Sequence, residues 1–398
     1  MTSATIERAN EVIAATYKRF PVVLTRGSGC TLWDETGKAY TDFVAGIAVC
    51  NLGHAHPQVA EALCRQARTL WHVSNLFYTG PQMELAAWLT DHSFADRVFF
   101  CNSGAEANEA AIKLARRYFK EAGRPERFRI ISMENSFHGR TMATLSATGQ
   151  EKVKTGFAPL LEGFDFVPFD DVAAIRAMIG PATAAVMLEP IQGEGGVRCP
   201  GPDFLKQVRA LCDAAGLLLI FDEIQTGMGR TGAMFAYEQC GVEPDIMTLA
   251  KALANGLPMG AMLARESVAA AFGPGAHAST FGGTPIVSAA ALEVCRVFER
   301  EGVLQHVRRV SEHFRLRLEW LKARHRLVEE VRGQGLLLGI RLGADGEPFV
   351  LACMERGFLI NCVQGNVLRF VPPLVIESGQ IDRLIDCLDE LFGQVRQG

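Results

Sequence analysis

The chain has 398 residues, more than one hydrophobic core usually serves, so we expect two domains, one of them large. Hydrophobic residues make up 48% and charged residues 21%, a globular balance that excludes a disordered chain. The net charge of −4 provides no basic surface for nucleic acid or an anionic membrane, which favours a small-molecule ligand.

The ends of the chain and its cysteines indicate a cellular location. Residues 1–17 carry charged side chains and lack the apolar core of a secretory signal, and no apolar run approaches membrane-spanning length. The 11 cysteines are scattered without a CxxC pair. We therefore expect a reduced, cytoplasmic protein without disulfides or a metal site. His54 and His56 have HxH spacing, but no third ligand is evident, which favours a packed, hydrogen-bonded pair.

The first two thirds of the chain predict a small antiparallel meander followed by an α/β layer. Short extended pieces at 22–24, 31–33 and 40–43 alternate with turns, and a helical pattern covers 57–69. Strand-like runs then alternate with helical stretches, which predicts a mostly parallel sheet. The expected strands are 97–101, 128–132, 184–188, 217–221 and 245–250, and the expected helices are 105–119 and 203–215.

The last third has a different pattern, typical of a smaller α+β domain. We expect helices at 285–300, 303–325 and from 378, and strands at 336–342, 358–362 and 367–371. The predicted division is residues 1–56, which join the small domain, a large domain at 57–284, and the small domain at 285–398.

Two of the predicted buried strands end in polar residues. Asp222 closes the run 217–221, and Lys251 closes the run 245–250. Ligands bind at the carboxyl ends of parallel strands, so if these strands are neighbours, both side chains face one pocket. Desolvation makes a lysine amine a nucleophile toward a carbonyl. The alternatives are a lysine that points to solvent and an aspartate that caps a helix or forms an ion pair.

A third motif indicates an anion site. Ser103 and Glu106 form a capping-box pattern at the start of a helix, and the small Gly104 and Ala105 allow an anion to approach the backbone. Free N–H groups and the helix dipole at such an end suit a phosphate. A capped helix without a ligand is the alternative.

A GxGxxG match at Gly227 to Gly232 suggests an NAD-dependent dehydrogenase, but its context is wrong. In a dinucleotide fold the first glycine turns the chain directly off the strand into a helix, whereas residues 222–226 intervene here and would place carboxylates near a pyrophosphate. We interpret the match as chance. An amine, a carboxylate and a phosphate site together indicate pyridoxal 5'-phosphate instead.

Five motifs in the same order extend this hypothesis, and by them the chain resembles the class III (ω-amino) pyridoxal-phosphate aminotransferases. They are NSGAEANE at 102–109, FHGR at 137–140, EPIQGEGG at 189–196, DEIQTG at 222–227 and STFGG at 279–283. The similarity covers about residues 21–373. It implies the type I aminotransferase fold, pyridoxal 5'-phosphate as cofactor, and a homodimer with active sites at the subunit interface.

The resemblance also implies roles for individual residues around the cofactor. Lys251 would hold the cofactor's aldehyde and shuttle the proton, and Asp222 would pair with the pyridine nitrogen. The others implied to contact the cofactor are Gln225 at the phenolic oxygen, Ser103, Gly104 and Ala105 at the phosphate, Phe137 on the ring, and Thr280 from the other subunit.

Substrate recognition is implied for Arg140, Glu194, Arg369 and Ser279. Arg140 would clamp a distal carboxylate. Arg369, in LRFVPP at 368–373, resembles a second carboxylate-binding arginine, and Glu194 matches the acid that masks it. Ile47 stands where relatives acting on ornithine carry a tyrosine that faces the free α-amine, which favours an acylated amine.

Within the class, the resemblance is strongest to members that transfer the amino group of N2-acetylornithine to 2-oxoglutarate, as in arginine biosynthesis. This transfer yields N-acetylglutamate 5-semialdehyde and glutamate. Alternatives are the same chemistry on succinyl-diaminopimelate, succinylornithine, ornithine or 4-aminobutyrate, or a mutase of the same fold. From other classes, the dehydrogenase and a non-catalytic, cofactor-free relative remain open.

Overall fold

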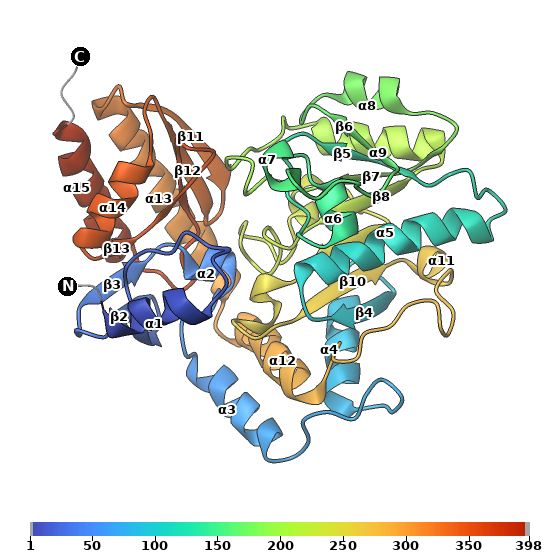
Figure 1. The fold of residues 1–398 in the computed structure, drawn as a ribbon, viewed down its shortest axis with the longest axis horizontal. Helices are drawn as coiled ribbons and strands as arrows, with labels where there is room; N and C mark the ends of the chain where they lie inside the picture. The colour runs from blue at the N-terminus through green and yellow to red at the C-terminus, as the bar shows by residue number, and fades with distance from the viewer. Residues whose placement is uncertain (1–2, 395–398) are drawn as a thin grey trace.

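A seven-stranded sheet forms the centre of the computed structural model, which describes residues 3–394 (Figure 1). Its strand order is β4 (Arg97–Cys101), β10 (Gly260–Ala264), β9 (Ile246–Leu249), β8 (Leu218–Asp222), β7 (Thr183–Leu188), β5 (Arg129–Met133) and β6 (Phe164–Val167). The pairs from β9 to β6 are parallel, while β10 is antiparallel to both β9 and β4. The predicted mostly parallel sheet is confirmed.

The central strands are apolar along their whole length because helices cover the sheet. Every residue of β7, β8 and β9 is buried. The long helix α5 (Gly104–Glu121) packs across β4, β9 and β10, and α9 (Phe204–Ala215) packs on β8. This burial explains why the strands read as continuous apolar runs rather than alternating ones.

Two smaller sheets contain strands from the chain's ends. The first has the order β1 (Leu24–Ser28), β2 (Thr31–Asp34), β3 (Ala39–Asp42) and β13 (Phe358–Leu359), with β13 parallel to β3. The second is antiparallel, with the order β11 (Val328–Gln334), β12 (Leu337–Leu342), β15 (Val367–Phe370) and β14 (Asn361–Val363). In Figure 1 the blue N-terminal strands lie beside the red C-terminal elements, away from most of the large sheet. The three-part domain division stays a prediction that this pairing supports.

The remaining elements are helical. They are α1 (Ala4–Val12), α2 (Ala45–Ala48), α3 (Pro57–Ala67), α4 (Gly80–Asp91), α6 (Met142–Ala147), α7 (Glu151–Lys154), α8 (Val172–Met178), α10 (Tyr237–Cys240), the 3-10 helix η1 (Lys251–Ala254), α11 (Glu266–Ala269), α12 (Pro285–Arg300), α13 (Val303–Arg324), α14 (Glu347–Glu355) and α15 (Ser378–Gly393). Within residues 3–394, none of the helices is both long and apolar enough to cross a bilayer.

The prediction of a single strand at 358–362 is wrong, because the segment is divided between two sheets. The chain changes sheets at Ile360, because Phe358 and Leu359 pair with β3 whereas Asn361 to Val363 pair with β15. Ile360 itself is buried, so apolar character continues through the break and hides it in the sequence.

Candidate active site

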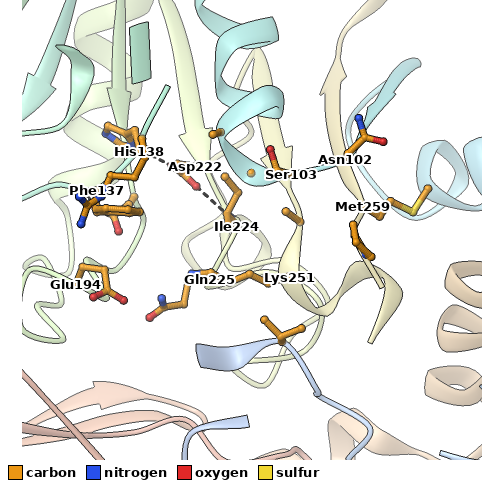
Figure 2. Close-up of a pocket in the computed structure, with 18 of the residues that line it drawn as sticks. Asn102, Ser103, Phe137, His138, Glu194, Asp222, Ile224, Gln225, Lys251 and Met259 are labelled. Atoms are coloured by element: carbon orange, nitrogen blue, oxygen red, sulfur yellow. Dashed lines mark hydrogen bonds and ion pairs between the residues drawn. The ribbon is translucent and has the colours of Figure 1, made fainter. Parts of the chain in front are cut away.

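Strands β8 and β9 are parallel neighbours, so their carboxyl ends meet at one edge of the sheet. Asp222 lies opposite Thr248 in the register, and Lys251 follows β9 by two residues. Both Asp222 and Lys251 line a cavity of about 430 Å³ (Figure 2). The carboxylate and amine that the sequence analysis singled out therefore face the same space.

Lys251 occupies an unusual backbone position at this edge. It opens η1 with φ 45°, in the left-handed region that a side chain with a Cβ rarely adopts, and such residues cluster at functional sites. Burial lowers the pKa of its amine, and the nearby cation Arg369 lowers it further, against the opposing charge of Glu194. The outcome is a pKa below the usual value for lysine, which favours a neutral, nucleophilic amine.

Asp222 is buried and held by a network of hydrogen bonds. Its Oδ2 accepts bonds of 2.7 Å from Asn108 Nδ2 and shares a 2.7 Å contact with His138 Nδ1. Its Oδ1 accepts the backbone N–H of Ile224 at 3.1 Å. Thr248 in turn donates to Asn108 Oδ1 at 2.7 Å. Figure 2 shows His138 and Ile224 linked to Asp222 at the edge of the pocket. These contacts fix the carboxylate in one orientation.

A second buried acid, Glu189, affects the protonation of the groups around Asp222. Burial opposes a charge on His138, but its hydrogen bond to Asp222 and the charges of Asp222 and Glu189 leave its pKa raised. Burial raises the pKa of Glu189 to about 8, although the charge of His138 opposes the rise. Glu189 Oε2 accepts the backbone N–H of Phe137 at 3.1 Å. Glu189 thus orients the segment that carries Phe137 and His138.

The N-terminus of α5 opens onto the cavity, with Ser103, Gly104 and Ala105 in its lining. One half of the predicted capping box is present, since Ser103 Oγ accepts the N–H of Glu106 at 3.2 Å. The Glu106 carboxylate accepts the N–H of Asn102 at 2.9 Å and not that of Ser103, so the reciprocal bond is shifted by one residue. A Cβ on Gly104 would lie 2.8 Å from Ile224, so only glycine permits this close packing. The anion site at this helix start stays a prediction.

Glu194, Gln225 and Arg369 form a charged cluster beside Lys251. Arg369 Nη1 lies 2.5 Å from Glu194 Oε1 and donates to Gln225 Oε1 at 3.4 Å. The Arg369 side chain is only 1% exposed, whereas that of Glu194 is 28% exposed. Although burial disfavours its charge, the cations Arg369 and Lys251 hold the pKa of Glu194 below its usual value. The structure therefore places Glu194 against Arg369, and the masking role of Glu194 stays a prediction.

Two of the other predicted site residues, Phe137 and Arg140, line the cavity, and the rest lie outside its lining. Phe137 lines it, and the exposed Arg140 lies at its edge, with the guanidinium carbon 5.6 Å from the Phe137 ring centroid. Ser279 accepts a 3.2 Å hydrogen bond from Asn102, a lining residue. Thr280 is exposed and lies outside this cavity. Ile47 is 42% exposed and is not part of the lining, where Val49 of the same segment is found.

Two other motifs are settled by their surroundings. Gly227 to Gly232 form a series of buried turns that does not open a helix, in agreement with a chance match to the dinucleotide motif. His54 pairs with Asp42, with Nε2 and Oδ2 2.7 Å apart, and not with His56, so that part of the expected histidine pair is wrong. Residues 3–394 contain no cluster of side chains suited to a metal ion.

Sequence reasoning did not assign His138, Asn108 or Glu189. His138 lies 84 residues from Asp222, and its motif FHGR gives no sign of the pairing. Asn108 is an inward-facing polar residue on α5 among buried alanines, and this was an available signal. A buried polar residue on an apolar helix face needs a partner, and Asp222 is that partner.

These residues fit pyridoxal phosphate. His138 lines the cavity, and its Nε2 is buried without a hydrogen-bond partner in residues 3–394, which leaves this polar atom available to a ligand. The amine of Lys251, the carboxylate of Asp222 and the free N–H groups of α5 line the same cavity. A nucleophile for an aldehyde, an acid for a ring nitrogen and a phosphate-binding helix end are the groups that this cofactor requires.

Comparison with known proteins gives an independent result. The model of the family "Aminotransferase class-III" matches residues 12–392. The chain is 50% identical over 382 residues to an acetylornithine aminotransferase of Caldanaerobacter subterraneus subsp. tengcongensis, covering 96% of this chain and 97% of that protein. It is also 50% identical over 381 residues to one of Methanocaldococcus jannaschii, covering 96% of each chain.

Solved structures agree with the fold. The ornithine aminotransferase of Toxoplasma gondii superposes with a TM-score of 0.94 at 35% identity, covering 98% of this chain and 94% of that one. An acetylornithine aminotransferase from Elizabethkingia anophelis superposes with a TM-score of 0.88 at 34% identity, covering 98% of both chains.

Proposed function

The chain belongs to the class-III aminotransferases, with the type I fold and a dependence on pyridoxal phosphate, and we propose that it transfers the terminal amino group of N2-acetylornithine to 2-oxoglutarate. The products are N-acetylglutamate 5-semialdehyde and glutamate, as in arginine biosynthesis. Relatives at 50% identity carry the name of this activity, and the dehydrogenase alternative is not favoured.

The ion pair between Glu194 and Arg369 carries the substrate assignment. Acetylornithine presents its terminal amine to the cofactor and has no carboxylate there, so an arginine neutralised by Glu194 does no harm. Glutamate reacts at its α-carbon, whose carboxylate needs Arg369 released from Glu194. A pair with one buried and one partly exposed member suits such a switch, because in this proposal the 28% exposed Glu194 side chain turns toward solvent while the buried Arg369 stays in place.

Each side chain of the cavity then has a defined task. Bound pyridoxal phosphate supplies an aldehyde for the amino group and a ring that takes up the electron pair when the neighbouring C–H bond breaks. Lys251 binds the aldehyde and moves the proton at the reacting carbon through its Nζ. Asp222, oriented by His138 and Asn108, keeps a proton on the ring nitrogen.

The remaining predicted contacts position the ligands. Ser103, Gly104 and Ala105 would hold the phosphate, Phe137 would pack against the ring and Gln225 would lie near the phenolic oxygen, since all five residues line the cavity. Arg140 at the cavity rim would clamp the distal carboxylate of either substrate. Ser279, the neighbour of Thr280 in the chain, would lie near the substrate.

A second copy of the chain completes the site in this proposal. Large apolar side chains gather on an exposed surface around residues 70–83 and 281, including Leu76 at 83% and Phe77 at 66% exposure. Thr280 adjoins this surface, and exposed apolar patches of this kind mark interfaces. We assign the patch to a homodimer in which Thr280 reaches the partner's phosphate site. The cytoplasmic location stays a prediction.

A substrate comparison tests the function. Purified protein is supplied with 2-oxoglutarate and either acetylornithine, succinyl-diaminopimelate, succinylornithine, ornithine or 4-aminobutyrate, and kcat/KM is measured for each. We expect the highest value for acetylornithine. A higher value for another amine would overturn the substrate assignment. Lys251→Ala controls for the chemistry, because it should abolish both turnover and the borohydride-sensitive yellow colour of the bound cofactor.

A further inference from the structure

Arg230, in the glycine run that resembled a dinucleotide motif, is among the largest fully buried side chains of the protein. Its Nη1 donates to the backbone oxygens of Leu336 at 2.9 Å and Pro372 at 2.6 Å. Its Nη2 donates to Asn51 Oδ1. One guanidinium thus joins the loop after β8 to an N-terminal segment and to two C-terminal segments.

The loop around Arg230 is shaped for close contact with the small sheet. The backbone oxygen of Arg230 accepts the N–H of Leu336 at 2.9 Å, so this residue both donates to and accepts from Leu336. Gly335 lies so near that a Cβ there would be 2.6 Å from the Arg230 oxygen. Asn51 Nδ2 donates back to the oxygen of Met228 at 2.6 Å. Gly335 thus allows the backbone of the small sheet to approach this loop closely.

The two C-terminal acceptors lie beside the strand that carries Arg369. Leu336 directly precedes β12, and Pro372 follows β15 by two residues. These strands are antiparallel partners, with Leu338 opposite Phe370 and Gly339 opposite Arg369. Arg230 therefore fixes the adjoining ends of β12 and β15 relative to the large sheet. One of its acceptors, Pro372, lies only three residues after Arg369 in the chain.

The chemistry of this contact argues for a positioning task over simple stability. All three acceptors are neutral, and no carboxylate in residues 3–394 forms an ion pair with Arg230. Burial lowers the pKa of Arg230 to about 9, so the side chain keeps its charge at neutral pH. A buried cation without an anionic partner stabilises a fold poorly compared with an apolar residue, whereas its rigid fork of donors defines geometry.

We propose that Arg230 is a positioning residue that holds Arg369 in register with Glu194, Gln225 and Lys251, and thereby sets recognition of the α-carboxylate of glutamate and 2-oxoglutarate. Glu194, Gln225 and Lys251 come from the large-sheet side, whereas Arg369 comes from β15. Arg230, on the loop after β8, is hydrogen-bonded to the ends of β12 and β15 and so connects the two groups. The inference rests on the proposed function, because it takes Arg369 as the carboxylate-binding group.

The test compares the holoenzyme with Arg230→Lys, which keeps the charge but cannot reach all three acceptors, and with Asn51→Ala, which removes a single acceptor. The probe is glutarate, a dicarboxylate without an amine, whose affinity is measured by calorimetry. Single-turnover reactions with glutamate and with acetylornithine are followed beside it. We expect Arg230→Lys to weaken glutarate binding and the glutamate reaction about tenfold, with acetylornithine changed less than about twofold, because misplacement of about 1 Å has effects of this size or larger.

Arg308→Lys is the matched control, since Arg308 Nε donates to the oxygen of Gly232 at 2.7 Å on the same loop, and within residues 3–394 its side chain forms no hydrogen bond to β12 or β15. It should leave glutarate affinity unchanged. Equal losses for both amines in Arg230→Lys, or unchanged glutarate affinity, would overturn the proposal. If Arg230→Lys does not fold, Asn51→Ala tests the proposal by the same measurements. We then expect a smaller loss of glutarate affinity, again with a larger effect on glutamate than on acetylornithine. A wild-type protein that reacts with neither amine would instead refute the proposed function.

Discussion

Replacing Glu194 with alanine should convert an enzyme that prefers a terminal amine into one with more activity toward α-amino acids. In the wild type, the α-carboxylate of glutamate must displace Glu194 from Arg369, to which it is bonded at 2.5 Å. Hydrogen bonds to charged groups contribute about 1.5–3 kcal/mol, and the 28% exposure of Glu194 favours the lower end. Removing 1.5 kcal/mol of competition corresponds to about a tenfold gain for glutamate relative to acetylornithine.

The same change affects the amine. The charge of Glu194 raises the pKa of Lys251 and that of Arg369 lowers it, so Glu194→Ala should lower the pKa of Lys251 further. The reaction with acetylornithine, whose amine is itself a cation, should slow beside an unmasked Arg369. The faster reaction with glutamate and the slower reaction with acetylornithine both raise the ratio of glutamate to acetylornithine activity.

Half-reaction rates with glutamate and acetylornithine, measured separately on the cofactor-loaded enzyme, give this ratio directly. Gln364→Ala is a suitable control, because Gln364 Nε2 donates to the backbone oxygen of Glu194 at 2.7 Å and leaves the carboxylate in place. A ratio in Glu194→Ala equal to that of the wild type would refute the masking role.

Three further changes test other parts of the site. His138→Phe removes one of the two partners of Asp222 Oδ2 and should weaken pyridoxal phosphate binding about tenfold or more, measured by cofactor titration. Unaltered affinity would contradict the network's role. Hybrid dimers of Lys251→Ala and Thr280→Glu subunits should regain about a quarter of wild-type activity in an equal mixture, because one of the two sites in each hybrid is intact only if Thr280 acts across the interface. Outside the cavity, the buried Glu223 follows Asp222 and accepts the backbone N–H groups of Ala236 and Tyr237. Burial raises its pKa from 4.5 to about 7, so its protonated form is favoured in the folded state and stability is lost as pH rises through this interval. Glu223→Gln should therefore flatten the fall in unfolding free energy between about pH 4.5 and 7 in urea titrations, by up to about 3 kcal/mol, and an equal slope would speak against a protonated Glu223.

The sequence was sufficient for those features that depend on local pattern. Asp222 and Lys251 end apolar runs, and since adjacent parallel strands align their ends, their shared cavity followed from two short segments. The exchange of sheets at Ile360 could not be predicted, because apolar residues stand on both sides of it and only long-range pairing distinguishes the two halves of the segment. The strands β10 and β11 and the helices α1 and α4 were not identified.

Side-chain partners distant in sequence were the other limit. His138 and Asp222 are joined by one contact over 84 residues, and no periodicity records such a contact. Arg230 was visible only as a member of a glycine-rich motif, and that motif pointed to the wrong chemistry. What identified its role was burial together with three acceptors from separate segments, all of which are properties of the folded chain.

The parallel pairing of β3 with β13 bears on how the protein is made on the ribosome. Thr41 lies beside Phe358, so the N-terminal sheet lacks its last strand until nearly the whole chain has been synthesised. At 5–20 residues per second, the intervening stretch takes roughly 15–60 s to translate. The large sheet, complete once Ala264 has emerged, is available to fold during this delay. For that interval β3 presents an open edge to other nascent chains, an aggregation hazard that ends when β13 arrives.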